Sequence, residues 1–393
     1  MACIRPATGA ATEQYYVLEA DCGVTPDNPG WLPLRYTGGV PSITKDFFQS
    51  QELDGSREVN DIRGGANQVN ATFDSELYYG SHDALFEAAL GGTWASGNTS
   101  AGLDITVDAT AKTFTRDSGD FTLDTNVGDL VSFPDLANGN NNGAFIATSV
   151  TPLVLTCANA EDLEDEANAT TGYLTSDKLE VGTTRRSFSI LTYFKDADGG
   201  SGEYHIAKGV EFTAYTFTVE PNAMVTGNFT CIGRSIDPDT TLPAGSTFPA
   251  TEKTEPFSGI DGKVLDDDVE VGFVTSATIN LDNAAAAQYV VGNNDTAFIS
   301  QGRANNTLSF ASYLLNSGNY IKYINEIELG VDIVLDGKDG SYAFTYPRVK
   351  YTSGAIDVAG EGDITQALGG QALAGTGANT GQSAITLQRI AKA

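Results

Sequence analysis

The sequence predicts a mainly β protein built from two tandem β-sandwich or barrel folds, each with a short flanking helix, and a small β-domain inserted into the first fold. Three observations support this prediction. The 43 glycines and the frequent Asn, Thr, Ser and Asp residues break the 393-residue chain into short segments. Apolar and polar residues alternate in several segments, which is the period of a half-buried strand. One order of strand, helix and hairpin also occurs twice.

The first unit begins with a strand over residues 69–77. Its odd-numbered residues are apolar or small and its even-numbered residues are polar, so we expect one face to pack against the core and the other to be exposed to solvent. Residues 81–90 then place apolar side chains at helical spacing, behind Ser81 as a capping residue and before Gly91 and Gly92 as a stop. The pattern predicts a short amphipathic helix directly after the strand.

The second unit repeats this arrangement. Residues 305–314 predict a strand in which Phe310 takes the place of Phe73, and residues 320–327 predict a short helix behind Asn319 as its cap. Residues 210–214 have a counterpart in residues 349–353, and each follows a hairpin with a turn rich in Asp and Gly, at 196–200 and 336–340. Three elements therefore recur in the same order.

The first unit is interrupted between helix and hairpin, which predicts the domain boundaries. We expect a first fold over residues 1–95 and 185–235, an inserted β-domain over 96–184, a Pro-rich linker over 236–257 and a second fold over 258–393. Flexible chain is expected from Gly369 to Gly381 before a last strand near 384–387. The strands expected in the insert are 103–107, 129–133, 144–147 and 153–156.

Charge and targeting signals exclude several classes of protein. The formal charge of −29 argues against a surface that binds phosphates, so any contact with nucleic acid is expected to be repulsive. The N-terminus shows no charged leader before an apolar run, and no stretch of about 18 apolar residues occurs, so we expect a soluble, unexported protein. The four cysteines, at 3, 22, 157 and 231, are scattered. Reduced thiols are the favoured state and disulfides the alternative, while metal binding by these thiols is disfavoured.

No pattern of catalytic or metal-ligating residues is found, and we predict no catalytic, cofactor or metal site. Only two histidines occur, His82 and His205, and both are expected to be structural. The acidic runs 161–166 and 266–268 lack the ligand spacing of a calcium loop and predict solvated faces. Asp196, Asp198 and Glu203 begin like such a loop, but the glycines at 199, 200 and 202 suit a hairpin turn better.

Two segments resemble a known family. Residues 58–65 and the run Glu76-Leu77-Tyr78-Tyr79-Gly80-Ser81-His82-Asp83-Ala84-Leu85-Phe86-Glu87-Ala88-Ala89-Leu90-Gly91-Gly92-Thr93-Trp94 are similar to the amino-terminal half of the tail tube proteins of siphophages. Residues 127–131, 141–145 and 149–151 resemble the small β-domain that these proteins often carry. Together the likenesses span most of residues 35–235, and the second unit joins the family through its match to the first.

The resemblance implies a structural protein whose strands join those of its neighbours into stacked rings around a channel for DNA. It implies the virion tail as its location, assembly in the host cytoplasm, and the tape measure, tail terminator and distal tail proteins as partners, with no membrane. Because each chain holds two folds, we expect three chains to form a pseudo-sixfold ring in preference to six chains. An acidic lumen would repel DNA, and the alternative is that the charge only keeps the subunit soluble. The insert is expected on the outer wall, and the loop over 38–54 is expected to reach the next ring.

Two other classes of function fit parts of the sequence. A β-rich acidic adhesin or carbohydrate-binding module would share the composition, but the missing export signal disfavours it. A glycosidase with two carboxylates is disfavoured further, because Trp31 and Trp94 are the only obvious sugar platforms and neither lies beside an acidic pair in the sequence.

Overall fold

A computed structural model describes residues 6–52, 55, 58–195, 202–239, 241–358, 360–375 and 383–392. The prediction of a mainly β fold is confirmed: this part of the chain contains twenty-five strands and two α-helices. Up to the insert, the elements are β1 Thr12–Leu18, β2 Leu32–Pro33, β3 Ser42–Gln49, β4 Ile62–Glu76 and α1 Asp83–Leu90. The insert contributes β5 Thr99–Asp108, β6 Thr113–Arg116, β7 Leu130–Ser132, β8 Ala144–Val150, β9 Val154–Ala158 and β10 Glu166–Thr175.

The remaining strands continue from the insert to the C-terminus. They are β11 Asp177–Glu180, β12 Phe188–Phe194, β13 Glu203–Val219, β14 Thr226–Gly233, β15 Ser235–Asp239, β16 Gly262–Asp266, β17 Val269–Glu270, β18 Val274–Asp282, β19 Ala286–Gln288 and β20 Phe298–Ser300. Then follow β21 Asn305–Tyr313, the helix α2 Gly318–Ile324, β22 Glu328–Asp336, β23 Gly340–Asp357, β24 Thr365–Ala372 and β25 Thr386–Ala391.

Eight of these strands form one continuous antiparallel sheet, which we call the central sheet. Its order is β3-β4-β14-β13-β18-β21-β24-β23. Only the second half of β13 and the second half of β23 belong to it, because each of these long strands bends into another layer in its first half. The β13–β18 pair joins the first four strands to the last four.

The first halves of the two long strands build outer layers. The first half of β13 lies between β12 and β15, and β12 continues to β1 and β2. The first half of β23 lies between β22 and β25, and these continue to β16 with β17 and to β11. Hairpins β12–β13 and β22–β23 therefore each turn a strand from an outer layer into the central sheet. The turn expected at 196–200 lies outside the described residues.

Helix α1 fills the space between the central sheet and the outer layer formed by β22, β25 and the first half of β23. Apolar residues at helical spacing give it a buried face, as the sequence predicted. The Phe86 ring packs on Tyr215 and Phe229 of the central sheet, with centroids 5.3 and 5.2 Å away, and on Tyr342 and Phe344 of the outer layer at 6.2 and 6.1 Å. One phenylalanine thus connects both layers of the main core.

The insert is a closed barrel with the order β10-β5-β6-β9-β8-β7. It has its own core around Phe114, Phe121 and Phe133. A second apolar cluster joins the barrel to the outer layer formed by β16, β22, β23 and β25, and it contains Leu130 and Ile146 of the barrel. The buried amide of Gln388 adds four hydrogen bonds there. It accepts from Leu130 N and Ser176 Oγ at 2.8 and 2.7 Å, and it donates to Gly128 O and Thr345 Oγ1 at 2.7 and 2.9 Å.

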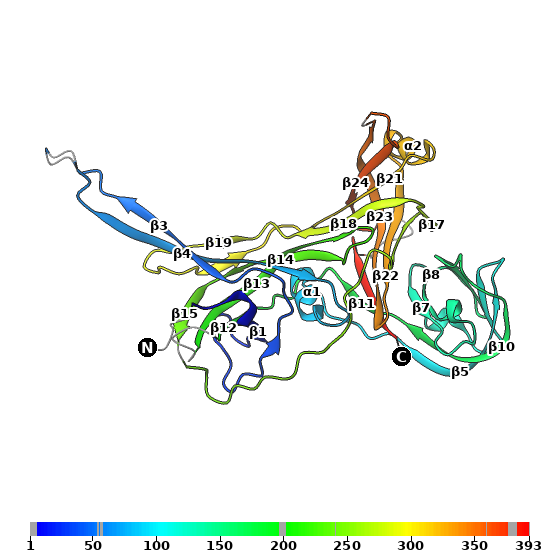
Figure 1. The fold of residues 1–393 in the computed structure, drawn as a ribbon, viewed down its shortest axis with the longest axis horizontal. Coiled ribbons are helices and arrows are strands. Elements are labelled where there is room, and N and C mark those ends of the chain that lie inside the picture. Colours follow the sequence, from blue (N-terminus) through cyan, green and yellow to red (C-terminus); the bar gives the residue numbers. More distant parts are fainter. Residues whose placement is uncertain are drawn as a thin grey trace.

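Two parts of the main body project from the molecule. The β3–β4 hairpin forms an arm at the left of Figure 1, while α2 and the ends of β21, β23 and β24 project toward the top. The inserted barrel lies at the right, beyond β22. The central sheet and the barrel therefore lie on opposite sides of the outer layer that contains β22.

Several sequence expectations about local structure are wrong. Ser81 does not cap α1, since the residue before the helix is His82, and the Ser81 hydroxyl faces Arg35 at 3.4 Å instead. Asn319 lies inside α2, which begins at Gly318. At α1, contacts from Arg35 and Tyr342 lie at the start of the helix. The stop at Gly91 is confirmed, because this residue has the left-handed φ of 65°.

Other expected boundaries also differ. The expected linker begins as a strand, β15, which pairs with β13. Strand β11 lies within the range expected for the insert, yet it pairs with β25 of the main body. The sequence predicts flexible chain from Gly369 to Gly381, but residues up to Ala372 belong to β24, which pairs with β21 and β23 in the central sheet, and residues 376–381 lie outside the described part of the chain. Glycine serves close strand packing here, because a Cβ atom on Gly370 would lie 2.6 Å from Val349 Cγ1.

Candidate assembly surfaces

The central sheet ends in two edges that carry no partner strand in the described part of the chain. At one end, β3 pairs with β4 alone. At the other end, residues 351–357 of β23 pair with β24 alone, although the start of the same strand segment also meets β22. Unpaired edges present a row of free backbone N–H and C=O groups, which can bind another strand. These two edges are the first candidate surface.

The face of the central sheet opposite the core is polar and open. Across β13, β18 and β21 the side chains form a ladder, in which Thr216 Oγ1 donates to Asn280 Oδ1 at 2.7 Å and Asn280 Nδ2 donates to Thr307 Oγ1 at 3.2 Å. Thr218 and Thr278 bond at 3.1 Å in the next row. We call this surface the polar face. It consists of Thr72, Asp74, Glu76, Ala214, Thr216, Thr218, Thr226, Asn228, Thr230, Thr278, Asn280, Asp282, Thr307, Ser309, Ala311, Lys350, Ser353, Ala355, Asp357, Ala367, Gly369 and Gln371.

The charge of the polar face is negative but sparse. Its carboxylates are Asp74, Glu76, Asp282 and Asp357, and none of them is in an ion pair within the described residues. Its one cation, Lys350, is neutralised by Glu326, with Nζ and Oε2 2.5 Å apart. Hydroxyl and amide groups make up most of the remainder. The net charge of the chain therefore resides mainly on other surfaces.

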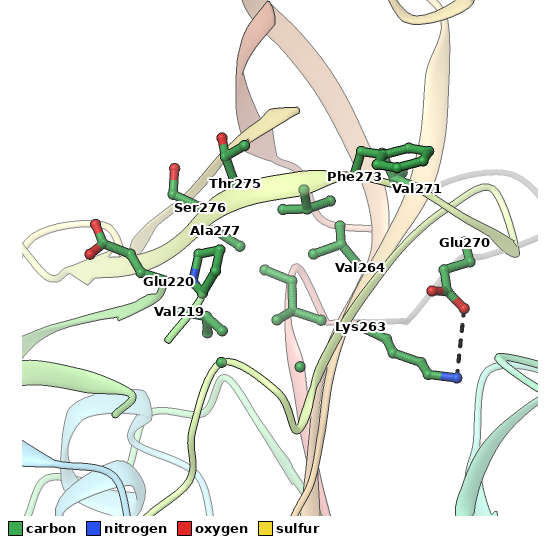
Figure 2. A pocket seen from close by; sticks show the side chains of 15 residues that line it. Val219, Glu220, Lys263, Val264, Glu270, Val271, Phe273, Thr275, Ser276 and Ala277 are labelled. Atoms are coloured by element: carbon green, nitrogen blue, oxygen red, sulfur yellow. Dashed lines mark ion pairs between the residues drawn. The ribbon is translucent and has the colours of Figure 1, made fainter. Parts of the chain in front are cut away.

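A cavity of about 200 Å³ lies where the β13–β18 pair ends, at the rim of the sheet away from the β3–β4 arm. Figure 2 shows Val219, Val264 and Phe273 around it, with Lys263 and Glu270 at one side. The Nζ and Oε2 atoms of that ion pair are 3.7 Å apart. The described lining contains no histidine, cysteine or aligned pair of nucleophile and base. The cavity is lined mainly by apolar side chains.

Apolar side chains are exposed on the arm and on α2. Phe47 and Phe48 of β3 are exposed, and so are Ile321 and Ile324 of α2. No residue of α2 is buried, whereas five residues of α1 are. The apolar face of α2 was not among the features expected from the sequence. The spacing of Ile321, Ile324 and Ile327 along an otherwise polar segment was the available signal.

Both histidines take structural positions. His82 is fully buried at the start of α1, stacks on Phe229 at 5.5 Å, and has Nε2 3.1 Å from Arg35 O. Loss of hydration lowers its pKa from 6.5 to about 4, so it is neutral near pH 7. His205 lies in β13, where its ring meets Phe194 edge to face at 5.0 Å.

The acidic runs bind their own chain. In residues 161–166, Glu161 pairs with Lys112 at 2.7 Å and Glu166 accepts backbone N–H groups of residues 137 and 138. In residues 266–268, the buried Asp266 pairs with Lys322 of α2 at 2.8 Å. Asp196 and Asp198 lie outside the described residues. Within the described ranges, no group of three or more His, Cys, Asp or Glu side chains could hold a metal ion.

The tryptophans and cysteines are also part of the packing. Trp31 is fully buried with Nε1 3.1 Å from Ser246 Oγ, and Trp94 is covered by Arg389, whose guanidinium carbon lies 4.4 Å from the ring centroid. Neither is an open sugar platform.

Cys22, Cys157 and Cys231 are free thiols, and Cys3 lies outside the described residues. Burial raises the pKa of the Cys231 thiol to about 12, so it stays protonated.

No helix in the described residues has the length and hydrophobicity needed to cross a membrane. The fold and its surfaces define a mainly β protein whose distinguishing features are open sheet edges and a broad polar face. The comparison with family models identifies the class more closely: residues 9–372 match the model of a phage tail tube protein family. The chain belongs to the phage tail tube proteins, a structural family. A search of curated proteins found no significant match.

Proposed function

We propose that this chain is the major tail tube subunit of a bacteriophage with a long non-contractile tail, and that it polymerises into stacked rings around a channel for DNA. The observation that supports this most is the open central sheet with one free edge at each end. Two different free edges on one chain can join head to tail, and such heterologous contacts close into a ring when the rotation allows it. Because the chain belongs to the tail tube family, a tube is the assembly that we expect.

The ring is proposed to contain three chains with pseudo-sixfold symmetry. The strands β4, β14 and β13 are linked by the same antiparallel pairs as β21, β24 and β23. Phe73 lies opposite Phe229 in the first set, and Phe310 lies opposite Leu368 in the second. We interpret the two four-stranded groups as copies of one tube fold. Each chain then supplies two of the six sectors of a ring.

The polar face is proposed to line the channel. Its hydroxyl and amide groups offer no concentrated positive charge, and Asp74, Glu76, Asp282 and Asp357 would repel the DNA phosphates. The genome could then slide without sites that bind it. The alternative from the sequence, that the acidity only keeps the free subunit in solution, applies to the many carboxylates elsewhere on the chain.

The insert is proposed to decorate the outer wall. From the polar face outward, the layers are the central sheet, α1 with Phe86, the outer layer with Tyr342, and then the barrel docked through Leu130. A module in this position projects away from the bore. The proposed partners are further copies of this chain, with the tape measure, tail terminator and distal tail proteins, in a virion tail assembled in the host cytoplasm.

Electron microscopy of the purified full chain under assembly conditions tests the proposal. We expect stacked rings of three chains, with the polar face toward the lumen and the inserted barrel outside. Rings with six whole chains would overturn the trimer, and a basic or apolar lumen would overturn the role of the polar face. Dispersed monomers under all assembly conditions would count against the function itself and favour an adhesin or other binding module.

A further inference from the structure

The internal joint between the two halves of the central sheet provides a template for contact between chains. Strand β13 pairs with β18 from Ala214 opposite Asp282 to Val219 opposite Ala277. On the core side of this joint, Tyr215 and Leu281 lie opposite each other and both are fully buried. The last strand of the first group thus meets the first strand of the second group. The unpaired strands of the chain are the reverse set, the first strand of the first group and the last of the second.

The equivalence of β13 and β23 can be fixed residue by residue. Each strand carries one extra residue against its partner, Thr213 against β14 and Thr352 against β24. Each of these threonines donates its Oγ1 hydrogen bond to a carbonyl oxygen of the neighbouring strand, at 3.3 and 3.2 Å. A bulge at the same place in both strands sets the register without ambiguity. Ser353 therefore corresponds to Ala214.

The other edge is fixed in the same way. Strand β3 places Ser42 opposite Asn70 of β4, and β18 places Asn280 opposite Thr307 of β21. Because Phe73 of β4 corresponds to Phe310 of β21, Asn70 corresponds to Thr307. Ser42 is then the counterpart of Asn280, and Thr44 is the counterpart of Asp282.

We propose that β23 of one chain pairs with residues 39–44 of the next chain, antiparallel, with Ser353 opposite Thr44 and Ala355 opposite Ser42. This register repeats the pairing of the internal joint between the two free edges of the central sheet. It rests on the proposed function, because it names the contact that would close the ring. The partner at each free edge is a second copy of this chain.

Exposed apolar residues at the free edges support this register. Ile43 is 45 % exposed, and its counterpart Leu281 is fully buried. Ile356 is 40 % exposed, and its counterpart Phe217 is fully buried. In the proposed joint Ile356 lies opposite Pro41, on the core side of the sheet. The contact would therefore cover those apolar side chains that the internal joint already covers.

The exposed face of α2 fits the same contact. Tyr323 of α2 packs on Gly354, where a Cβ atom would lie 2.8 Å from the tyrosine ring, and Phe86 of α1 packs on the corresponding Tyr215. The outer side of α1 is covered by the outer layer of the following group. On α2 the corresponding side leaves Ile321 and Ile324 at 51 % and 58 % exposure. The outer layer of the next chain, with β12 and the first half of β13, would cover it.

Paired cysteines test the register in assembled tubes. In a chain with Cys3 and Cys22 changed to serine, Ser353→Cys and Thr44→Cys are combined, because opposite residues of an antiparallel pair lie within disulfide range. The matched control combines Ser353→Cys with Ser42→Cys, a diagonal pair about 7–8 Å apart. After oxidation, we expect covalent dimers and closed trimers on a non-reducing gel for the first pair, and at least tenfold less product for the control.

Hydrogen exchange on tubes of the unaltered chain gives a second readout that needs no variant. Among residues 353–357, the backbone amides that point to the free edge and not to β24 are expected to exchange at least tenfold more slowly in tubes than in dispersed subunits. Tubes in which neither cysteine pair cross-links, or both do equally, would overturn the register while leaving the proposed function in place, as would unchanged exchange at 353–357. A chain that never forms tubes would overturn both.

Discussion

Two buried titratable groups are expected to give the folded subunit opposite responses to pH. His82 is held neutral, because loss of hydration lowers its pKa from 6.5 to about 4. Asp332 of β22 is held protonated, because burial raises its pKa from 3.8 to about 7, against a smaller lowering by the Thr345 hydroxyl, and the nearby Asp268 adds to the rise. One carboxylate oxygen of Asp332 lacks a hydrogen-bond partner among the described residues. Both groups therefore bind protons differently in the folded and unfolded chain.

The sign and size of each effect follow from proton linkage. Between pH 6.5 and 4 the unfolded chain protonates His82 and the folded chain does not. Acidification over this range therefore lowers the free energy of unfolding by about 3 kcal/mol, at about 1.4 kcal/mol for each unit of pKa. Between pH 7 and 3.8 the folded chain keeps Asp332 protonated and the unfolded chain does not. Acidification over that range therefore raises the free energy of unfolding by about 4 kcal/mol. The two contributions largely cancel in the unaltered protein.

The variants His82→Gln and Asp332→Asn separate the two contributions. Urea unfolding of dispersed subunits, followed by the fluorescence of Trp31 and Trp94, is measured from about pH 4 to about pH 8. Relative to the unaltered chain, the histidine variant should gain about 3 kcal/mol on going from pH 7 to pH 4, and the asparagine variant should lose about 4 kcal/mol over the same range. The double variant should show the sum, because the two sites share no partner. Differences that do not change with pH would refute the reasoning.

Two predictions concern the inserted barrel. Gln388→Leu leaves the buried Leu130 N and Gly128 O without partners, at a cost of about 2–5 kcal/mol, and limited proteolysis should then release the barrel faster. Unchanged proteolysis would mean that the apolar cluster alone holds the joint. Replacing residues 98–175 by a short Gly/Ser linker, with Val334→Thr to make the uncovered surface polar, should still give tubes with a thinner wall, because no strand of the barrel belongs to the central sheet. Folded subunits that cannot polymerise would contradict the outer position of the insert.

The strands that carry a clear period of two could be predicted from the sequence. Strand β4 buries Val69, Ala71 and Phe73 and exposes Thr72 and Asp74, as the alternation indicated. This signal is local, since it depends only on which face of one strand meets the core. The mainly β class followed from these strand patterns. The approximate positions of the two helices were predictable for the same reason, because the helical spacing of apolar residues is also a local signal.

The details that depend on remote residues could not be predicted. The start of α1 is fixed by Arg35, which lies close to Ser81, and by Tyr342, whose hydroxyl accepts a hydrogen bond from Gly80 N at 3.0 Å. Both partners are far away in the sequence. The glycines of β24 have the composition of a flexible segment, yet Gly370 lies under Val349 in a packed sheet. Composition alone does not distinguish a glycine that needs freedom from one that needs space.

The sequence led us to expect strands that join neighbouring chains, but it did not show which strands lie at the open edges. The location of these edges explains how a free chain can avoid indiscriminate pairing. Gly38 exchanges both backbone hydrogen bonds with Asp74, at 3.4 and 3.0 Å, so the alternation turns the backbone groups of Pro41 and Ile43 toward the free edge. Proline has no N–H to donate there, and it weakens casual pairing at an edge strand. The internal joint has Ile279 at the position of Pro41 and Tyr215 at the position of Gly354.

A contact between chains built on Pro41 and Gly354 would be weaker than the internal joint. It lacks one hydrogen-bond donor, and it lacks the burial of one large aromatic side chain, which is worth about 1.5–3 kcal/mol. Duplication within one chain makes half of the six joints in the proposed ring permanent. The other half would then form only where the edge, the apolar side chains beside it and the face of α2 are covered together, which favours complete rings over random strand pairing.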